Sequence, residues 1–274
     1  MAQHKVTPLF ISSEQGQLFA MYYPSSVENT SKCIVHVPAF AEEMNKSRHM
    51  VAMQSSAFTE RGYSVLVLDL FGTGDSQGGF SEATWISWLQ SIEAAFVWLD
   101  SQGVESISLW GVRSGVLLAL DFLQQYTYPV EKLICWQPVL NGETFMMQFL
   151  RLRIASAMMD KDIPQEKTSD LRRQLQEGNC LEVAGYMLNP ELVNPIMALK
   201  ARKLNVLNVK QCLVFELSAE SEATISVACD QWVNLLKEQG CKVLAFTMQG
   251  SSFWAAQEMV NVPELIDLTA LKVC

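Results

Sequence analysis

The segment Gly111-Val-Arg-Ser-Gly115 has residue types and a spacing that bear directly on chemistry. It lies between a short apolar run, typical of a buried strand, and a helical pattern. Two glycines at this spacing frame the sharp strand-to-helix turn that carries a catalytic serine in Gly-x-Ser-x-Gly sequences. Here Arg113 stands at the central position and Ser114 follows it. A shift of one residue directs a side chain elsewhere, so Ser114 is a candidate nucleophile but is better explained as a residue at the start of the helix.

A serine at such a turn needs a histidine in the loop after the last strand. That loop reads Gly250-Ser-Ser-Phe-Trp254, with Phe253 where the histidine is expected. The histidines of the chain are His4, His36 and His49, all far upstream. His36 falls inside an apolar strand, where we expect it to be packed and neutral. The usual Ser–His–acid triad is therefore excluded.

The acid of a triad would follow the strand Cys212–Leu217, where the sequence offers glutamates and no aspartate. These residues are Glu216, Glu220 and Glu222. A carboxylate with no histidine to orient has no part in a triad. We interpret this segment as an acidic, solvated loop.

Two carboxylates, Glu42 and Glu43, follow the strand Cys33–Pro38. In proteins with a nucleophile at the strand-to-helix turn, this loop supplies an oxyanion-hole amide. A guanidinium in a partly buried cleft is strongly unfavourable without a partner. We therefore predict an ion pair between Arg113 and Glu42 or Glu43. Such a pair would either plug an abandoned site, or bind a carboxylate or phosphate, or activate water with a glutamate as general base.

Aromatic residues near strand ends or in site loops are candidates for a ligand pocket, with core packing as the alternative. The candidate ligand-binding residues are Phe40, Trp136, Phe253 and Trp254. The run Phe145-Met-Met-Gln-Phe-Leu-Arg-Leu predicts an amphipathic helix over an apolar ligand, or a subunit interface. The glycines of the segment 72–79 match neither a dinucleotide nor a Walker motif, and no His/Cys/Asp cluster has metal spacing. We expect no cofactor and no metal.

Strand and helix patterns alternate along most of the chain, which predicts a mostly parallel sheet with helices on both faces. The alternation stops over residues 143–208, which are predicted to be helical, without a strand, and to form a cap over the carboxyl ends of the strands. Residues Ser251–Met259 are predicted to begin the last helix. The fold class is α/β, with the nucleophile-elbow context of the α/β-hydrolase fold, and residues 1–274 form one domain that contains the cap.

Composition limits the partners. Of the 274 residues, 49% are apolar and 18% charged, as in a globular protein with a large core. A formal net charge of -9 argues against binding to nucleic acid or to anionic membrane surfaces. Seven scattered cysteines indicate reduced, mostly buried thiols in a cytoplasmic protein. The first residues lack an apolar signal core, and no apolar run approaches the roughly 18 residues of a transmembrane segment.

Several of these segments together resemble one family. The runs Pro38-Ala-Phe-Ala-Glu-Glu-Met-Asn-Lys-Ser-Arg48 and Asp69-Leu-Phe-Gly-Thr-Gly-Asp-Ser76, the Gly-Val-Arg-Ser-Gly turn, and Phe253-Trp254 with Glu258 carry the resemblance. The family is the second of two hydrolase-like families found beside exosortase A systems, which sort proteins in bacteria that make exopolysaccharide. The resemblance implies the α/β-hydrolase fold, a role linked to that locus and, by the family's name, ester or thioester hydrolysis. It also implies that the arginine and the phenylalanine are family features.

Three functions remain open. The first is a pseudo-hydrolase that binds an acyl or carboxylate ligand beneath the cap. The missing triad favours either this function or a scaffold role over a standard hydrolase. The second is an active ester or thioester hydrolase with a rebuilt site of Glu42, Glu43 and Arg113. The third is a scaffold that holds a partner or a second copy of itself as a homodimer.

Overall fold

A single sheet organises the chain. The computed structural model describes residues 5–28, 30–157, 166–206, 208–220, 222 and 224–273. Within these ranges eight strands form one sheet in the order β1-β2-β4-β3-β5-β6-β9-β10. β1 and β2 form an antiparallel hairpin, β2 pairs antiparallel with β4, and every later pairing is parallel. The strands are β1 Thr7–Ser13, β2 Gly16–Tyr23, β3 Lys32–Val37, β4 Ser64–Leu68, β5 Ser106–Val112, β6 Val130–Trp136, β9 Val209–Ser218 and β10 Lys242–Gln249.

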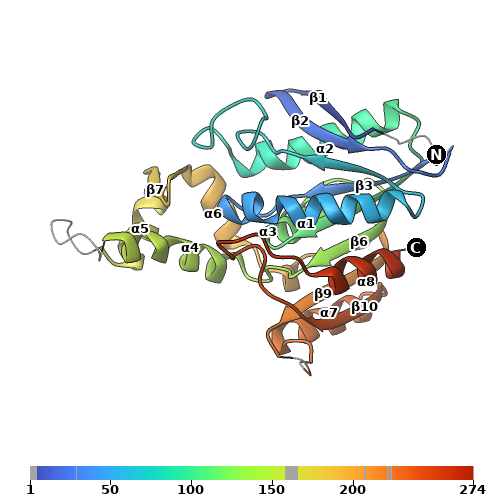
Figure 1. Cartoon of the computed structure of the whole chain (residues 1–274). Helices are drawn as coiled ribbons and strands as arrows, with labels where there is room; N and C mark the ends of the chain where they lie inside the picture. Colours follow the sequence, from blue (N-terminus) through green and yellow to red (C-terminus); the bar gives the residue numbers. More distant parts are fainter. Residues whose placement is uncertain are drawn as a thin grey trace.

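Helices cover both faces of this sheet (Figure 1). α1 (Glu42–Thr59) and α8 (Pro263–Val273) pack on one face. α2 (Trp85–Ser101), α3 (Ser114–Gln125) and α7 (Val227–Glu238) pack on the other. Except for the edge strand β10, the strands of the parallel part are largely buried on both faces, which explains their continuous apolar runs. The expected α/β architecture is confirmed.

The insertion between β6 and β9 projects from one end of the sheet (Figure 1). Its elements are α4 Gly142–Ala157, α5 Thr168–Gln176, β7 Leu181–Val183, β8 Tyr186–Leu188, α6 Pro190–Ala198 and the short helix η1 Ala201–Lys203. The expectation that this region holds no strand is wrong, because β7 and β8 form an antiparallel hairpin. Ala184 and Gly185 make its turn with φ of 51° and 83°, a backbone that suits a two-residue hairpin turn. Residues 158–165 and 207 of the predicted cap lie outside the described residues.

The pattern of Ser251–Met259 predicted the start of the last helix, and this prediction is wrong. Short turns hold it, with the Phe253 amide donating to the Ser251 carbonyl at 2.8 Å, and Phe253 and Trp254 are buried. Helix α8 begins at Pro263, where a missing N–H is tolerated because the first turn of a helix leaves that donor unpaired. An irregular loop therefore brings Trp254 to the end of the sheet.

Two further features bear on the sequence predictions. The described cysteines carry free thiols, five of them buried and Cys180 exposed, as expected for mostly buried thiols. Among the helices that the structure describes, none is long and apolar enough to cross a membrane.

Candidate functional site

The Gly111–Gly115 segment forms the predicted sharp turn between β5 and α3. Arg113 has φ of 56° and ψ of −118°, a conformation that non-glycine residues adopt only when their surroundings impose it. A Cβ on Gly115 would collide with the backbone carbonyls of Val37 and Pro38, and one on Gly111 with the backbone of Val116. Both glycines are therefore needed to bring helix and sheet this close. Arg113 occupies the apex that a nucleophile would occupy.

Backbone strain is concentrated around this turn. Over the described ranges, the non-glycine residues with positive φ are Ala41, Arg113, Gln137 and Ala184. Ala41 directly precedes α1, Gln137 follows β6, and Ala184 lies in the cap hairpin. Strained residues of this kind cluster at functional sites, where surrounding structure holds them. Backbone strain therefore points to the turn around Arg113 as a functional site, as the residue types of the Gly111–Gly115 segment also do.

The predicted ion pair forms, and its partner is Glu43. Arg113 Nη2 donates to Glu43 Oε1 at 3.1 Å, and Nε donates to Oε1 at 3.3 Å and to Oε2 at 3.2 Å. The two side chains are 18% and 22% exposed, so the pair is shielded yet reachable. Glu42, the other candidate, instead accepts hydrogen bonds from Asn45 and Tyr186. A bidentate, partly buried arrangement of this kind is the strong form of an arginine–carboxylate contact.

Two further contacts orient the guanidinium of Arg113. Its Cζ lies 5.0 Å from the ring centroid of Trp254, in the range of a cation–π contact. Its Nη1 donates to the carbonyl of Gln137 at 3.4 Å. These bonds leave one N–H on each terminal nitrogen without a partner among the described residues. Arg113 can therefore still donate hydrogen bonds to a ligand.

The electrostatics of Glu43 are unusual for a paired carboxylate. Burial raises its pKa, and the positive charges of Arg113 and Lys46 oppose that rise without cancelling it. The ionised form is therefore less stable here than in water, even beside its partner. A carboxyl group with a raised pKa, in a cleft, is a better proton acceptor than an ordinary glutamate.

A pocket of about 370 Å³ opens above the pair, between the cap and the sheet. Phe145, Phe149 and Leu152 of α4 form its apolar wall. Arg113, Glu42, Glu43, Lys46 and Trp254 supply the polar and aromatic remainder, with Gln148, Ala184 and Ala255. The volume lies within the range of small-molecule sites.

The four predicted ligand-binding aromatics separate into three positions. Trp254 lines the pocket. Phe40 is fully buried behind it, with its ring 5.1 Å from Phe149 and 6.0 Å from Phe145. Trp136 and Phe253 pack in the core on the α8 side, where Trp136 Nε1 donates to Thr269 Oγ1 at 3.0 Å. The structure does not place those two in the lining of this pocket.

Ser114 is the first residue of α3 and is buried. The carboxylate of Glu216 accepts from the backbone amide and hydroxyl of Ser226, both at 2.8 Å, and so holds the start of α7. His36 Nδ1 lies 3.2 Å from the carbonyl oxygen of Trp110, and burial lowers its pKa to about 3. His49 bonds Asn261 through Nε2 at 2.6 Å, while His4 lies outside the described residues. Ser114, Glu216, His36 and His49 do not form a triad around Arg113.

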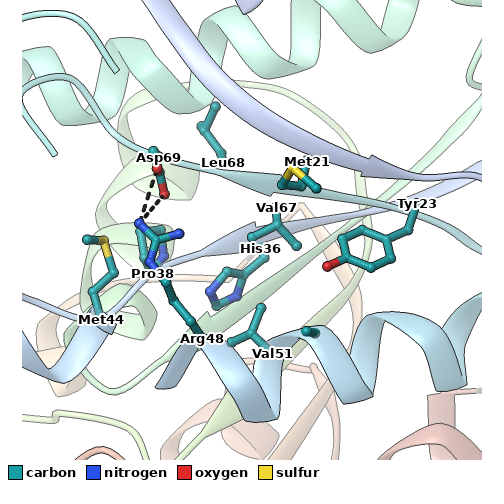
Figure 2. Close-up of a pocket in the computed structure, with 11 residues that line it drawn as sticks. Met21, Tyr23, His36, Pro38, Met44, Arg48, Val51, Val67, Leu68 and Asp69 are labelled. Atoms are coloured by element: carbon teal, nitrogen blue, oxygen red, sulfur yellow. Dashed lines mark hydrogen bonds and ion pairs between the residues drawn. The ribbon is translucent and has the colours of Figure 1, made fainter. Parts of the chain in front are cut away.

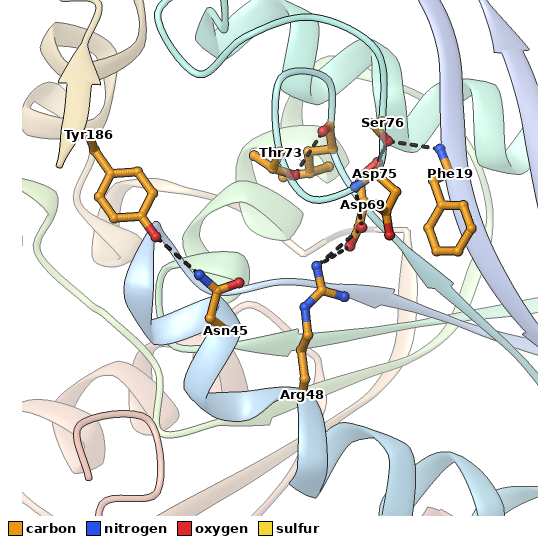
Figure 3. A network of polar contacts seen from close by, with 9 residues as sticks. Phe19, Asn45, Arg48, Asp69, Thr73, Asp75, Ser76 and Tyr186 are labelled. Atoms are coloured by element: carbon orange, nitrogen blue, oxygen red, sulfur yellow. Dashed lines mark hydrogen bonds and ion pairs between the residues drawn. The ribbon is translucent and has the colours of Figure 1, made fainter. Parts of the chain in front are cut away.

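Sequence reasoning missed the contact between the cap hairpin and α1. The Tyr186 hydroxyl donates to Glu42 Oε2 at 3.1 Å. It also accepts from Asn45 Nδ2 at 3.1 Å (Figure 3). Close by, Lys46 Nζ donates to the carbonyl of Ala255 at 3.3 Å. Gly185 was the available sequence signal for the turn of this hairpin. Over the described residues, no three His, Cys, Asp or Glu side chains come together in a way that could hold a metal ion.

Comparison with known proteins supports the fold. No family model matches the chain, and no curated protein matches it at the threshold applied. Among solved structures it is similar to Est1E from Butyrivibrio proteoclasticus, with a TM-score of 0.62 and 16% identity over 97% of this chain and 95% of that one. A serine hydrolase homologue from Coxiella burnetii gives a TM-score of 0.59 and 16% identity, covering 98% and 97%. The esterase PF2001 from Pyrococcus furiosus gives 0.61 and 12%, covering 98% and 89%.

Proposed function

We propose that this chain, which has the α/β-hydrolase fold, is a pseudo-hydrolase that binds an acyl ligand beneath its cap. One observation carries the proposal. Arg113 occupies the apex of the elbow turn in the strained backbone conformation of that position, and Glu43 and Trp254 hold its guanidinium at the floor of an apolar-walled pocket. A side chain held in this way is suited to bind and orient a ligand, and it offers no nucleophile.

The contacts favour a neutral acyl group over a free carboxylate. Glu43 already compensates the charge of Arg113, so little positive charge remains for an anion. A carbonyl oxygen needs only a hydrogen-bond donor, which the unpaired N–H groups of Arg113 provide. The acyl chain would lie along Phe145, Phe149 and Leu152. An ester or thioester therefore suits both halves of the pocket.

A second candidate is an active hydrolase with a rebuilt site. The raised pKa of Glu43 is the observation that favours it, because such a carboxylate accepts a proton from water more readily. In that reaction Glu43 takes a proton from water, the hydroxyl adds to the carbonyl carbon, and Arg113 donates to the developing oxyanion. The tetrahedral intermediate then collapses, the carbon–oxygen or carbon–sulfur bond to the leaving group breaks, and the released alkoxide or thiolate takes the proton from Glu43.

Two other parts of the proposal have separate support. The segments Pro38–Arg48 and Asp69–Ser76, through the family resemblance, support a link to exosortase and exopolysaccharide systems. The mostly buried free thiols support a cytoplasmic location. A scaffold or homodimer role remains the third alternative, and its support is the apolar pattern of α4.

A hydrolysis panel separates the first two candidates. We would assay acyl esters and acyl thioesters, together with methyl ferulate, because Est1E has also been solved with ferulic acid bound. The wild-type protein would be compared with Arg113→Met, Glu43→Gln and Ser114→Ala. The pseudo-hydrolase proposal expects background rates throughout. Turnover lost in Glu43→Gln and Arg113→Met but kept in Ser114→Ala would establish the rebuilt hydrolase instead, and turnover lost only in Ser114→Ala would restore a serine nucleophile.

A further inference from the structure

A second cavity, of about 220 Å³, lies under α1 and away from the cap pocket (Figure 2). The register of the sheet sets its floor, because Met21, Val67 and His36 are neighbours across β2, β4 and β3 and face α1. Above this row the helix presents the short side chains of Val51 and Ala52. The space arises because the helix side chains there are too short to fill it.

The imidazole of His36 contributes to the lining of this cavity. His36 is only 3% exposed, and its Nδ1 lies 3.2 Å from the Trp110 carbonyl oxygen. A carbonyl can only accept, so Nδ1 carries the proton and Nε2 is a bare acceptor. Burial lowers the pKa of the ring to about 3, and Arg48 adds to that effect, so the imidazole is neutral at pH 7. Nε2 has no hydrogen-bond partner among the described residues, so it can accept a hydrogen bond from a ligand in the cavity that His36 lines.

The charges at the mouth of the cavity cancel. Arg48 Nη2 donates to Asp69 Oδ1 at 3.0 Å and to Oδ2 at 3.2 Å. Asp69 is itself held by the amide of Asp75 at 3.1 Å and, through its carbonyl, by the hydroxyl of Ser76 at 2.6 Å (Figure 3). The pair is therefore neutral overall, and it offers little attraction to a free anion or cation.

The Tyr23 hydroxyl is a second polar group of the cavity wall that can form a hydrogen bond with a ligand hydroxyl. The phenol of Tyr23 extends from β2 with its oxygen directed toward His36 (Figure 2). Burial raises its pKa, so it is a neutral hydroxyl that can donate or accept. Most of the remaining wall is apolar, made by Met21, Met44 and Val67. The cavity thus combines apolar sides with one fixed acceptor and one adaptable hydroxyl.

We infer that this cavity binds a small, neutral, mainly apolar molecule with one hydroxyl group, which donates to His36 Nε2. Phenols and short alcohols are the class. A cavity of about 150 Å³ lined by apolar side chains is large enough for benzene, so the volume here admits a substituted ring or a short chain. The inference does not depend on the function proposed for the cap pocket.

The test uses phenol and toluene, which differ in replacing a hydroxyl by a methyl group of similar size. Imidazole ¹⁵N spectra would be recorded on the full chain, with His36 assigned from a His36→Phe variant. Phenol should move the His36 Nε2 resonance to lower frequency in a saturable manner, since a hydrogen bond now reaches that lone pair. Toluene should leave it in place. Phenol should also bind about fivefold more tightly than toluene, the size of one net hydrogen bond.

Two variants on α1 locate the effect. Ala52→Leu should fill the cavity and abolish the shift, whereas Ala57→Leu, a half-buried position on the same helix outside the cavity lining, should preserve it. Comparison of phenol with toluene in the wild-type protein remains decisive even if His36→Phe folds poorly. No saturable shift with phenol, equal affinity for toluene, or a shift that survives Ala52→Leu would each overturn the proposal.

Discussion

The two pockets on either side of the first turns of α1 accommodate titratable groups in opposite ways. Under the cap, Arg113 and Glu43 form a hydrogen-bonded ion pair that is partly exposed to solvent. Under the helix, His36 is fully buried and neutral, with its pKa lowered to about 3. The difference follows from access to a partner, because Arg113 reaches a carboxylate whereas His36 meets only a backbone carbonyl. The first pocket is built to present a charged group, and the second to present an uncharged acceptor.

The two pockets should therefore respond to pH with opposite signs. The pKa of Glu43 is raised in the folded state, so the folded protein binds this proton more tightly than the unfolded chain, and stability falls as pH rises through that raised value. The pKa of His36 is lowered, so the folded protein binds its proton more weakly, and stability falls as pH drops from 6.5 toward 3.

The largest expected change in stability comes from a substitution that disrupts the turn at the end of β5, which positions Arg113. In Gly115→Val the new side chain would meet the carbonyls of Val37 and Pro38, which belong to β3 and the loop before α1. We expect a loss of about 3 kcal/mol or more in the free energy of unfolding, measured with urea. Gly79→Ala is the control, since a Cβ there makes only an ordinary contact. Equal stability of the two variants would show that the elbow is not tightly packed.

The second prediction concerns the pocket under α1. The unfolding free energy of the wild-type protein should fall with a slope of up to about 1.4 kcal/mol per pH unit below pH 6.5, because burial lowers the pKa of His36. His36→Phe should remove that part of the slope, and His49→Gln should keep it. Urea unfolding at a series of pH values measures both, and an unchanged slope in His36→Phe would contradict a buried neutral histidine.

The third prediction separates the members of the ion pair. Arg113→Met leaves Glu43 buried without its cation, so we expect a loss of about 1–2 kcal/mol at pH 7 that diminishes as pH falls and Glu43 takes up a proton. Glu43→Gln leaves Arg113 without its carboxylate, so it should also lose stability near neutral pH, but by less than Arg113→Met because the guanidinium keeps its contacts with Trp254 and the Gln137 carbonyl. Combining the two changes should restore part of the loss seen in Arg113→Met.

Glu42→Gln is the matched control for the same experiment, because Glu42 does not contact Arg113. Additive effects of the Arg113 and Glu43 substitutions in unfolding free energy would show that the pair carries no coupling, and would contradict the site as described.

The smallest effect concerns the cap. Tyr186→Phe removes the hydroxyl that bonds Glu42 and Asn45, in an exposed setting. We expect about 0.5 kcal/mol or less in global stability but faster amide exchange in β7 and β8, because the hairpin loses its contact with α1. Tyr128→Phe, at a residue that packs against Phe96 and Phe122, is the control for hydrogen exchange. Unchanged protection of the hairpin would show that packing alone holds it.

Much of the fold was predictable because strand and helix periodicities differ and the parallel strands are apolar throughout. The pairing of Arg113 with a carboxylate followed from charge alone. The choice between Glu42 and Glu43 did not, because adjacent residues point about 100° apart on a helix and the start of α1 was not known from the sequence. Trp136 illustrates the same limit for strands, since it faces α8 while its neighbour Cys135 faces the other side. The β7–β8 hairpin was missed because three-residue strands carry almost no alternation.

The central claim is that the Arg113 pocket binds an acyl ligand without converting it. The most direct measurement is calorimetric titration of the wild-type protein with the hexanoyl thioester of N-acetylcysteamine. The account predicts a saturable heat that returns to baseline after each injection. A sustained heat from continuing hydrolysis would show that the protein is an enzyme, and no heat that saturates would show that the pocket does not hold an acyl group.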